Sequence, residues 1–175
     1  MGSKITIRCD CLGISGGWTP AVHLFTQSGG KLKFRDEDQV FIPDKYPSDQ
    51  LSIGSCNGDF TLDEILSSIP NKLKKFLDVK KTDYDDLEIK SSFNKSKRNI
   101  WLLPSDKVIG KTKPFVDFQN DATAKDIKLA LREGFRSIEH VKRYTTTGMG
   151  TDQGKMGNMH ALGIISETAG TKMGE

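Results

Sequence analysis

The chain has 175 residues, 35% of them hydrophobic, and a formal net charge of +3. A chain of this length buries a core without metal or disulfide support, and its near balance of 26 basic and 23 acidic residues excludes nucleic acid or an anionic membrane as the main partner. No apolar run is long enough to span a membrane or to act as a signal peptide, and three unevenly spaced cysteines do not form a secreted disulfide framework. We therefore expect a cytoplasmic protein that is a piece of a longer polypeptide.

The N-terminal part alternates expected strands with glycine turns. Ile5–Leu12 places apolar residues at every second position, which predicts a half-buried strand. Ser15-Gly16-Gly17 then forms a turn, and Thr19 with Pro20 predicts the start of a helix that ends at Gly29-Gly30. The pattern is strand, glycine turn, helix.

A second copy of this pattern follows. Short strands are expected at Lys31–Phe34 and Gln39–Ile42, and again at Leu51–Ile53. The last of these enters a glycine turn, Gly54–Gly58, and Thr61 with Glu64 is spaced as a capping box. We expect a helix to start there and to carry Ile65 and Leu66 inward.

The C-terminal third is predicted to be helical. Thr123 with Asp126 predicts a helix start, Ser137 predicts the next, and a third helix is expected from about Lys155 to Glu167. Between the two halves, residues 80–113 are expected to connect them with one or two short strands around the apolar island Ile100–Pro104. The apolar residues expected to face inward from the three helices are Ile127, Ala130, Leu131, Ile138, Val141, Met159, Leu162 and Ile165.

The histidines and cysteines do not form a recognisable metal site. Cys9 and Cys11 share one face of the expected strand, but a metal ion needs two further ligands that Cys56 alone does not supply. The favoured interpretation is buried strand cysteines. The histidines are far apart and are interpreted as surface or helix-packing residues; they are His23, His140 and His160.

Three segments offer glycines or cations to an anionic ligand. The two glycine turns each precede a helix N-terminus, where amides and the helix dipole suit a phosphate, although neither is a full GxGxxG motif and a plain turn is an equal alternative. The third segment, Lys142–Lys155, combines three cations with four threonine hydroxyls and suits a cofactor phosphate. From residue types alone, the favoured interpretation is a solvated polar loop between helices.

Long ordered motifs in this chain resemble the α-subunit family of heterotetrameric sarcosine oxidase. They cover nearly the whole chain apart from its lysine-rich middle. The matching segments are Phe115–Asp121, Arg136–Thr146, Gly148–Lys155, Ser15–Pro20, His23-Leu24 and Gln27–Gly30.

The resemblance implies a mixed α/β (α+β) fold in three parts. Residues 1–79 are similar to the later part of a Rossmann-like dinucleotide-binding domain, and residues 114–175 are similar to a small helical BFD-like domain. Residues 80–113 form the segment that connects these two parts. In related amine dehydrogenases that domain holds a two-iron two-sulfur cluster on four cysteines. The positions that match those cysteines here lack thiolates; they are Asp117, Gln119, Asp152 and Gly157.

The resemblance also implies an oxidoreductase component. Family members oxidatively demethylate sarcosine to glycine with oxygen as acceptor and pass the one-carbon unit to tetrahydrofolate. The α subunit holds NAD, FMN lies near a subunit interface, and FAD and tetrahydrofolate are bound outside the part that resembles this chain. The implied partners are the β, γ and δ subunits, and no catalytic residue is expected in this segment.

Two groups of cofactor-contacting residues are implied. The NAD group is Ser15, Gly16, Gly17, Ser55, Cys56, Asn57, Gly58, Phe60, Thr61 and Leu62. The group expected to face the FMN phosphate or a partner subunit is Arg143, Thr145, Thr146, Gln153 and Lys155. The alternatives are a scaffold or subunit-docking module with no cofactor contact, and an electron-transfer module with an iron-sulfur cluster, which the missing cysteines disfavour.

Overall fold

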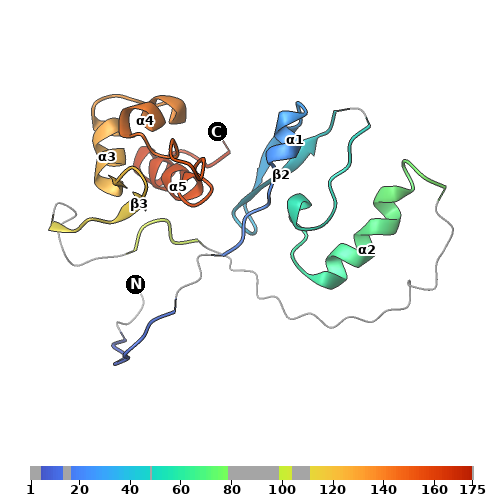
Figure 1. Cartoon of the computed structure of the whole chain (residues 1–175), viewed down its shortest axis with the longest axis horizontal. Coiled ribbons are helices and arrows are strands. Elements are labelled where there is room, and N and C mark those ends of the chain that lie inside the picture. The colour runs from blue at the N-terminus through green and yellow to red at the C-terminus, as the bar shows by residue number, and fades with distance from the viewer. Residues whose placement is uncertain (1–4, 14–16, 48, 79–98, 104–110, 175) are drawn as a thin grey trace. The chain divides into compact units, whose positions relative to one another are not determined.

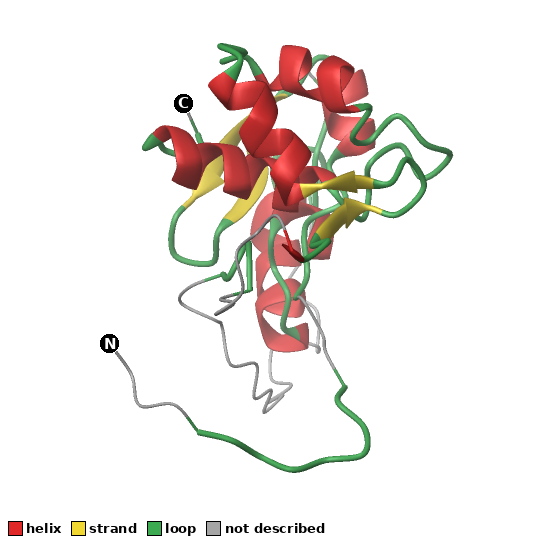
Figure 2. Ribbon diagram, turned by 90° about the vertical axis from the view of Figure 1, so that its left-hand side faces the viewer, coloured by secondary structure: helices red, strands yellow, loops and turns green. Residues whose placement is uncertain are grey.

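The structure is a computed structural model of the chain with two compact units (Figure 1). It describes residues 5–13, 17–47, 49–78, 99–103 and 111–174. The first unit comprises residues 1–32 and 40–93, and the second, here called the helical unit, comprises residues 33–39 and 94–175. The described residues contain both helices and short strands (Figure 2), so the expected mixed α+β class is confirmed.

The predicted hairpin is present. Strands β1 (Lys31–Arg35) and β2 (Val40–Lys45) pair in a two-stranded sheet around a charged turn. Within that turn, Arg35 Nε donates a hydrogen bond of 2.7 Å to Asp38 Oδ1. Gln39 adopts a left-handed backbone conformation, with φ of 59°. A local polar contact thus fixes the turn where the sequence places it.

Helix α1 is shorter than expected. It spans His23–Gln27, because Val22 N–H donates to Pro20 O in a tight turn that precedes the helix. Its Phe25 is 4% exposed and meets the ring of Tyr46 edge to face, with ring centroids 4.9 Å apart. A Cβ at Gly30 would lie 2.4 Å from the Phe25 ring, so only glycine fits beside it.

Helix α2 begins where the capping box predicts. It spans Leu62–Leu73 after the short 3-10 helix η1 (Gly54–Asn57), and the Thr61 side chain and Glu64 cap it reciprocally. None of the residues of α2 is buried, and Leu66 is 39% exposed, so the expectation that it points inward is wrong. Ile65 is half-buried.

The helical unit contains the three expected helices and a small hairpin that was not expected. Strands β3 (Phe115–Asp117) and β4 (Ala122–Thr123) pair antiparallel. Helix α3 (Ala124–Arg132) follows directly, with the Thr123–Asp126 capping box in place. Helices α4 (Ile138–Thr145) and α5 (Asn158–Ala169) complete the unit.

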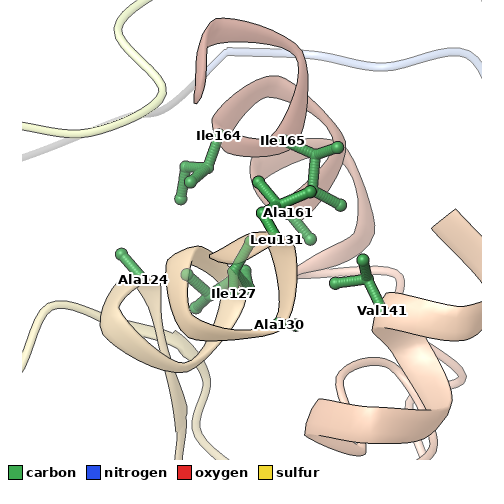
Figure 3. Packing of buried hydrophobic residues seen from close by; sticks show 9 residues of the cluster. Ala124, Ile127, Ala130, Leu131, Val141, Ala161, Ile164 and Ile165 are labelled. Atoms are coloured by element: carbon green, nitrogen blue, oxygen red, sulfur yellow. The ribbon is translucent and has the colours of Figure 1, made fainter. Parts of the chain in front are cut away.

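The core of the helical unit lies where α3 packs against α4 and α5 (Figure 3). Trp101 packs against it from the connecting segment, and a Cβ at Gly163 would lie 2.2 Å from the Trp101 ring. Ile138, expected inside, is 39% exposed, whereas Met159 and Leu162 are half-buried. The buried cluster is Val116, Ala124, Ile127, Ala130, Leu131, Val141, Ala161, Ile164 and Ile165.

Several expectations for the first unit are wrong. Ile5–Leu12 forms no strand, and its Ile5 and Ile7 are 78% and 79% exposed, because no second strand pairs with this segment among the described residues. Cys9 and Cys11 are therefore exposed rather than buried. Leu51–Ile53 also forms no strand.

The connecting segment is described only in part. Residues 99–103 and 111–113 contain no strand, and the rest of residues 80–113 lies outside the described residues. Within the described parts of the chain, no helix has the length and apolar character that crossing a bilayer requires.

Candidate functional site

The segment between α4 and α5 forms a closed loop. We call residues 146–157 the α4–α5 loop. Many of its backbone N–H groups already have acceptors, so the loop is not an open cradle of amides. The N–H groups so occupied are those of Thr147, Gly148, Met149, Asp152, Gln153, Gly154 and Lys155.

Asp117 anchors this loop to the end of β3. Its side chain is buried, and its Oδ2 accepts a hydrogen bond of 2.7 Å from Gly148 N–H. Its Oδ1 accepts from the N–H groups of Gln119 and Asn120 at 2.9 and 3.1 Å. Burial alone raises the pKa of Asp117, but the hydrogen bonds from Gly148, Asn120 and Gln119 outweigh it and hold the pKa below 3.8. The carboxylate is thus kept ionised by donors from both segments.

Gln119 makes the second attachment. Its Oε1 accepts hydrogen bonds from Thr151 Oγ1 at 3.1 Å and from Asp152 N–H at 3.3 Å. Asp152 in turn accepts from Gly154 N–H at 3.1 Å through its Oδ1. One glutamine side chain on the β3–β4 turn therefore holds the middle of the loop.

The glycines of the loop make room for neighbouring groups. A Cβ at Gly148 would lie 2.2 Å from Asn158 Oδ1, and one at Gly150 would lie 2.1 Å from Gln119 Oε1. At Gly157 a Cβ would lie 2.6 Å from the backbone oxygen of Val116. Close packing, rather than an open phosphate cradle, explains why glycine stands at these positions.

The residues expected to face FMN or a partner differ in exposure. Arg143, Thr146, Gln153 and Lys155 are exposed, so their side chains are available to a ligand or another protein. Thr145 is buried, and its hydroxyl donates to Val141 O at 2.8 Å. The role of the exposed four stays a prediction, and the geometry gives Thr145 an internal role.

Two of the exposed residues hold unfavourable backbone conformations. Thr146 has φ of 59° and Gln153 has φ of 52°. A β-branched residue in this left-handed region is a genuine outlier, and such strain gathers at functional sites. Among the five described non-glycine residues with positive φ, Thr146, at the C-cap of α4, is the one that is β-branched.

The glycine turn before α2 is closed by a carboxylate. Glu64 Oε2 accepts from Phe60 N–H and Thr61 N–H, each at 3.3 Å. Gly58 N–H donates to Ser55 O at 3.1 Å. The amides of Gly58, Phe60 and Thr61 are therefore taken, and Glu64 places a negative charge beside two of them. These backbone groups fit a phosphate poorly, whereas Ser55 and Leu62 expose their side chains to other contacts.

The predicted NAD residues between Ser55 and Leu62 lie in the turn and at the start of α2. Ser55 and Leu62 are exposed, Cys56, Asn57 and Phe60 are half-buried, and Gly58 and Thr61 are buried. Asn57 Oδ1 accepts from Tyr46 Oη at 2.9 Å, which ties the turn to β2. Gly17 is exposed with φ of 99°, and Ser15 and Gly16 lie outside the described residues.

Four positions match the cysteines that hold an iron-sulfur cluster in related amine dehydrogenases, and in this structure they lie close together in pairs. Gln119 bonds the backbone of Asp152, and Gly157 packs on the residue before Asp117. Among the residues that the structure describes, no group of three His, Cys, Asp or Glu is placed to hold a metal ion. The histidines, on α1, α4 and α5, are exposed. Hydrogen bonds and packing thus join the two segments that carry these positions.

A small cavity lies beside the loop. It has a volume of about 160 Å³ and is lined by apolar residues of α3, α4 and α5, including Ile127, Val141 and Ile165. Thr147 and Asn158, at the two ends of the loop, also line it. The cavity is close in size to one apolar side chain.

Sequence reasoning missed the anchoring role of Asp117 and Gln119. Both were noted only as positions without a cysteine. A local Asx turn is part of this role, because Asp117 Oδ1 accepts hydrogen bonds from the N–H groups two and three residues further on, those of Gln119 and Asn120. The bonds to Gly148 and Asp152 are long-range and leave no mark in local sequence.

Comparison with known proteins confirms the resemblance. Residues 111–175 match the family model described as the sarcosine oxidase A3 domain. The chain is 32% identical over 185 residues to the sarcosine oxidase subunit alpha of Rhizobium meliloti (strain 1021), a match that covers 99% of the chain. It is 30% identical to the proteins of the same name from Corynebacterium sp. strains P-1 and U-96, each match covering 97% of the chain.

The chain spans 18% of the length of each of these relatives. The relatives are named as subunits of an oxidase. The chain is therefore similar to one segment of an oxidoreductase subunit that takes part in a larger assembly.

Proposed function

From this chain-long resemblance to sarcosine oxidase α subunits, we propose that the chain is a segment of such a subunit and supplies binding surfaces rather than a reaction centre. The observation that carries the proposal is the 32% identity over 99% of the chain. The A3-domain match to residues 111–175 supports it, since it covers α3, α4 and α5.

For the whole protein we propose the activity after which its relatives are named. The protein oxidatively demethylates sarcosine to glycine with oxygen as acceptor, and the one-carbon unit passes to tetrahydrofolate. The proposed assembly has β, γ and δ subunits and works in the cytoplasm. FAD and tetrahydrofolate are assigned to parts of the complex outside this chain. The flavins supply the redox chemistry when bound, and the present residues bind and orient.

In the helical unit, the α4–α5 loop and the end of α4 are proposed to face the FMN phosphate at a subunit interface. Arg143 and Lys155 are exposed cations there, and Arg143 lies 4.0 Å from Glu139 in a weak surface ion pair. Since much of the loop backbone is occupied, the phosphate is met by side chains. Such a contact is screened by salt.

In the first unit, the turn before α2 is proposed to contact NAD through side chains. Ser55 offers a hydroxyl, and Phe60 and Leu62 offer apolar surface. Because Glu64 occupies the neighbouring amides, these contacts suit the adenine and ribose and leave the phosphates to other parts of the subunit.

A docking module without cofactor contact is the second candidate. Glu64 occupies amides of the turn before α2, and Asp117 and Gln119 occupy amides of the α4–α5 loop. This occupation favours the docking module, because an amide that already donates a hydrogen bond must lose that bond before it binds a phosphate.

The test uses the assembled enzyme with the double variant Arg143→Ala/Lys155→Ala. FMN content is measured by absorbance after acid release, and subunit composition by native mass spectrometry. The matched control is Lys125→Ala/Arg132→Ala, which removes two exposed cations from α3.

Three outcomes separate the candidates. Loss of FMN from an intact assembly, with normal FMN in the control, supports the phosphate-facing role. Loss of a subunit from the assembly supports the docking module. Unchanged FMN and unchanged composition overturn both assignments for these two cations.

A further inference from the structure

The side chains of Asp117 and Gln119, at the end of β3 and in the β3–β4 turn, join this hairpin to two backbone N–H groups and one hydroxyl of the α4–α5 loop. Among the described residues, three hydrogen bonds make this junction. Asp117 Oδ2 accepts from Gly148 N–H at 2.7 Å. Gln119 Oε1 accepts from Thr151 Oγ1 at 3.1 Å and Asp152 N–H at 3.3 Å. The two acceptors therefore hold the loop near its start and at its middle.

The junction is specific in position. Gly148 and Gly150 leave space that Asn158 and Gln119 side chains fill, because a Cβ at either glycine would meet them at 2.2 and 2.1 Å. Moving the loop by one residue would place a side chain against these atoms. The acceptors therefore set the register of the loop as well as its location.

The two anchors differ in strength. The Asp117 carboxylate is 6% exposed, and donors surround both of its oxygens, so the Gly148 bond is charge-assisted. Gln119 is exposed and neutral, and its two bonds are longer. Removing the charge at Asp117 is therefore the larger perturbation.

We propose that Asp117 and Gln119 are positioning residues that hold the α4–α5 loop, and with it Thr146, Gln153 and Lys155, in the conformation presented to the FMN phosphate or partner. This deepens and rests on the proposed function of that loop. The anchors act through the loop and do not touch the ligand themselves. The attachments at Gly148, Thr151 and Asp152 lie between Thr146 and Gln153, the two loop residues with positive φ.

The first measurement is amide hydrogen exchange on the whole chain. In Asp117→Asn, exchange of the loop peptide that contains Gly148 is expected to become about 10- to 100-fold faster, the effect of losing one charge-assisted bond. The peptides of α5 keep their exchange rates. Gln119→Leu, at an exposed position that tolerates substitution, is expected to accelerate exchange at Asp152 by about 5- to 10-fold.

The controls separate positioning from general stability. Gln119→Glu keeps the accepting oxygen, so loop exchange should stay near that of the unaltered chain. Asp126→Asn removes another carboxylate of low pKa from the same unit, at the α3 cap. It should accelerate exchange at the start of α3 and leave the loop unchanged.

The second measurement is FMN content of the assembled enzyme carrying the same variants. If the loop loosens in Asp117→Asn and Gln119→Leu and FMN falls, both proposals stand. If the loop loosens and both FMN and assembly are unchanged, the anchors stand and the proposed function of the loop fails. If loop exchange is unchanged in both variants, or Asp126→Asn accelerates it equally, the positioning role is overturned.

Discussion

Helices α2 and α3 begin with the same motif and differ in what they bury. Each starts at a threonine whose side chain caps the helix, with an acidic residue three positions later that bonds back. Helix α3 buries four residues, including Ile127 and Ala130, whereas no residue of α2 is buried. A capping box therefore specifies where a helix begins, and tertiary packing decides how much that helix contributes to stability.

The largest expected effect breaks the core of the helical unit. Ile127 is fully buried at the centre of α3, so Ile127→Ala should lower the free energy of unfolding by about 2–5 kcal/mol. Urea titration followed by circular dichroism and by fluorescence measures it, because Trp101 packs on this core while Trp18 is 71% exposed.

The matched substitution in α2 sharpens the contrast. Leu66→Ala removes a side chain that is 39% exposed and should cost less than about 1 kcal/mol. Equal losses at Leu66 and Ile127 would contradict the difference between the two helices.

A smaller effect is expected where α5 meets β3. Gly157→Ala places a Cβ 2.6 Å from the backbone oxygen of Val116, and because backbone must move, the cost should be about 1–3 kcal/mol. Gly13→Ala in the first unit is the control, since nothing lies within 4 Å of its added Cβ. Thermal unfolding of the two variants compares them, and an unchanged midpoint for Gly157→Ala would show that the contact relaxes freely.

The two units should also respond to opposite extremes of pH. In the helical unit, hydrogen bonds donated by Thr123 hold the pKa of Asp126 below 3.8. The hydrogen bonds that Asp117 accepts outweigh the effect of its burial and also hold its pKa below 3.8. Stability from these groups is present above pH 3.8 and is lost as pH falls through the folded-state pKa values.

In the first unit, burial raises the pKa of Tyr46 above 10.0, and the nearby Cys56 and Asp59 add to it. Its stability contribution is present below pH 10.0 and is lost as pH rises through the folded-state pKa. Hydrogen exchange at low and at high pH, analysed peptide by peptide, reports the stability of each unit separately. If the helical unit of the double variant Asp117→Asn/Asp126→Asn still lost the same stability in acid, these two carboxylates would not be its cause.

The last comparison concerns the shared motif itself. Thr61→Ala and Thr123→Ala each remove one cap and should cost about 1 kcal/mol. The corresponding serine variants keep the hydroxyl and should be close to neutral. If Thr61→Ala were several-fold more costly than Thr123→Ala, α2 would carry packing that the described residues do not show.

Local signals in the sequence predicted the features that local contacts stabilise. The β1–β2 hairpin and both capping boxes depend on residues within four positions of one another, such as Arg35 with Asp38 and Thr123 with Asp126. The inward face of α3 follows from its apolar period, and Ile127, Ala130 and Leu131 are buried as predicted.

The failures need partners distant in sequence. The alternation in Ile5–Leu12 is typical of a strand, but a strand forms only beside another, and none pairs with it in the described residues. The site shows the same limit. Polar composition found the α4–α5 loop, while its attachment to Asp117 spans 31 positions and no local pattern encodes it.

The packed glycines of the α4–α5 loop have a consequence for proteolysis. Arg143 and Lys155 are exposed sites for trypsin, yet a protease must draw the chain out into an extended form before it cuts. With Gly148 and Asp152 bonded to the β3–β4 turn, that opening costs several hydrogen bonds at once. Trypsin should therefore cut this glycine-rich segment after Lys155 more slowly than its composition suggests. The glycines of this loop reflect the close approach of neighbouring groups rather than a freely moving chain.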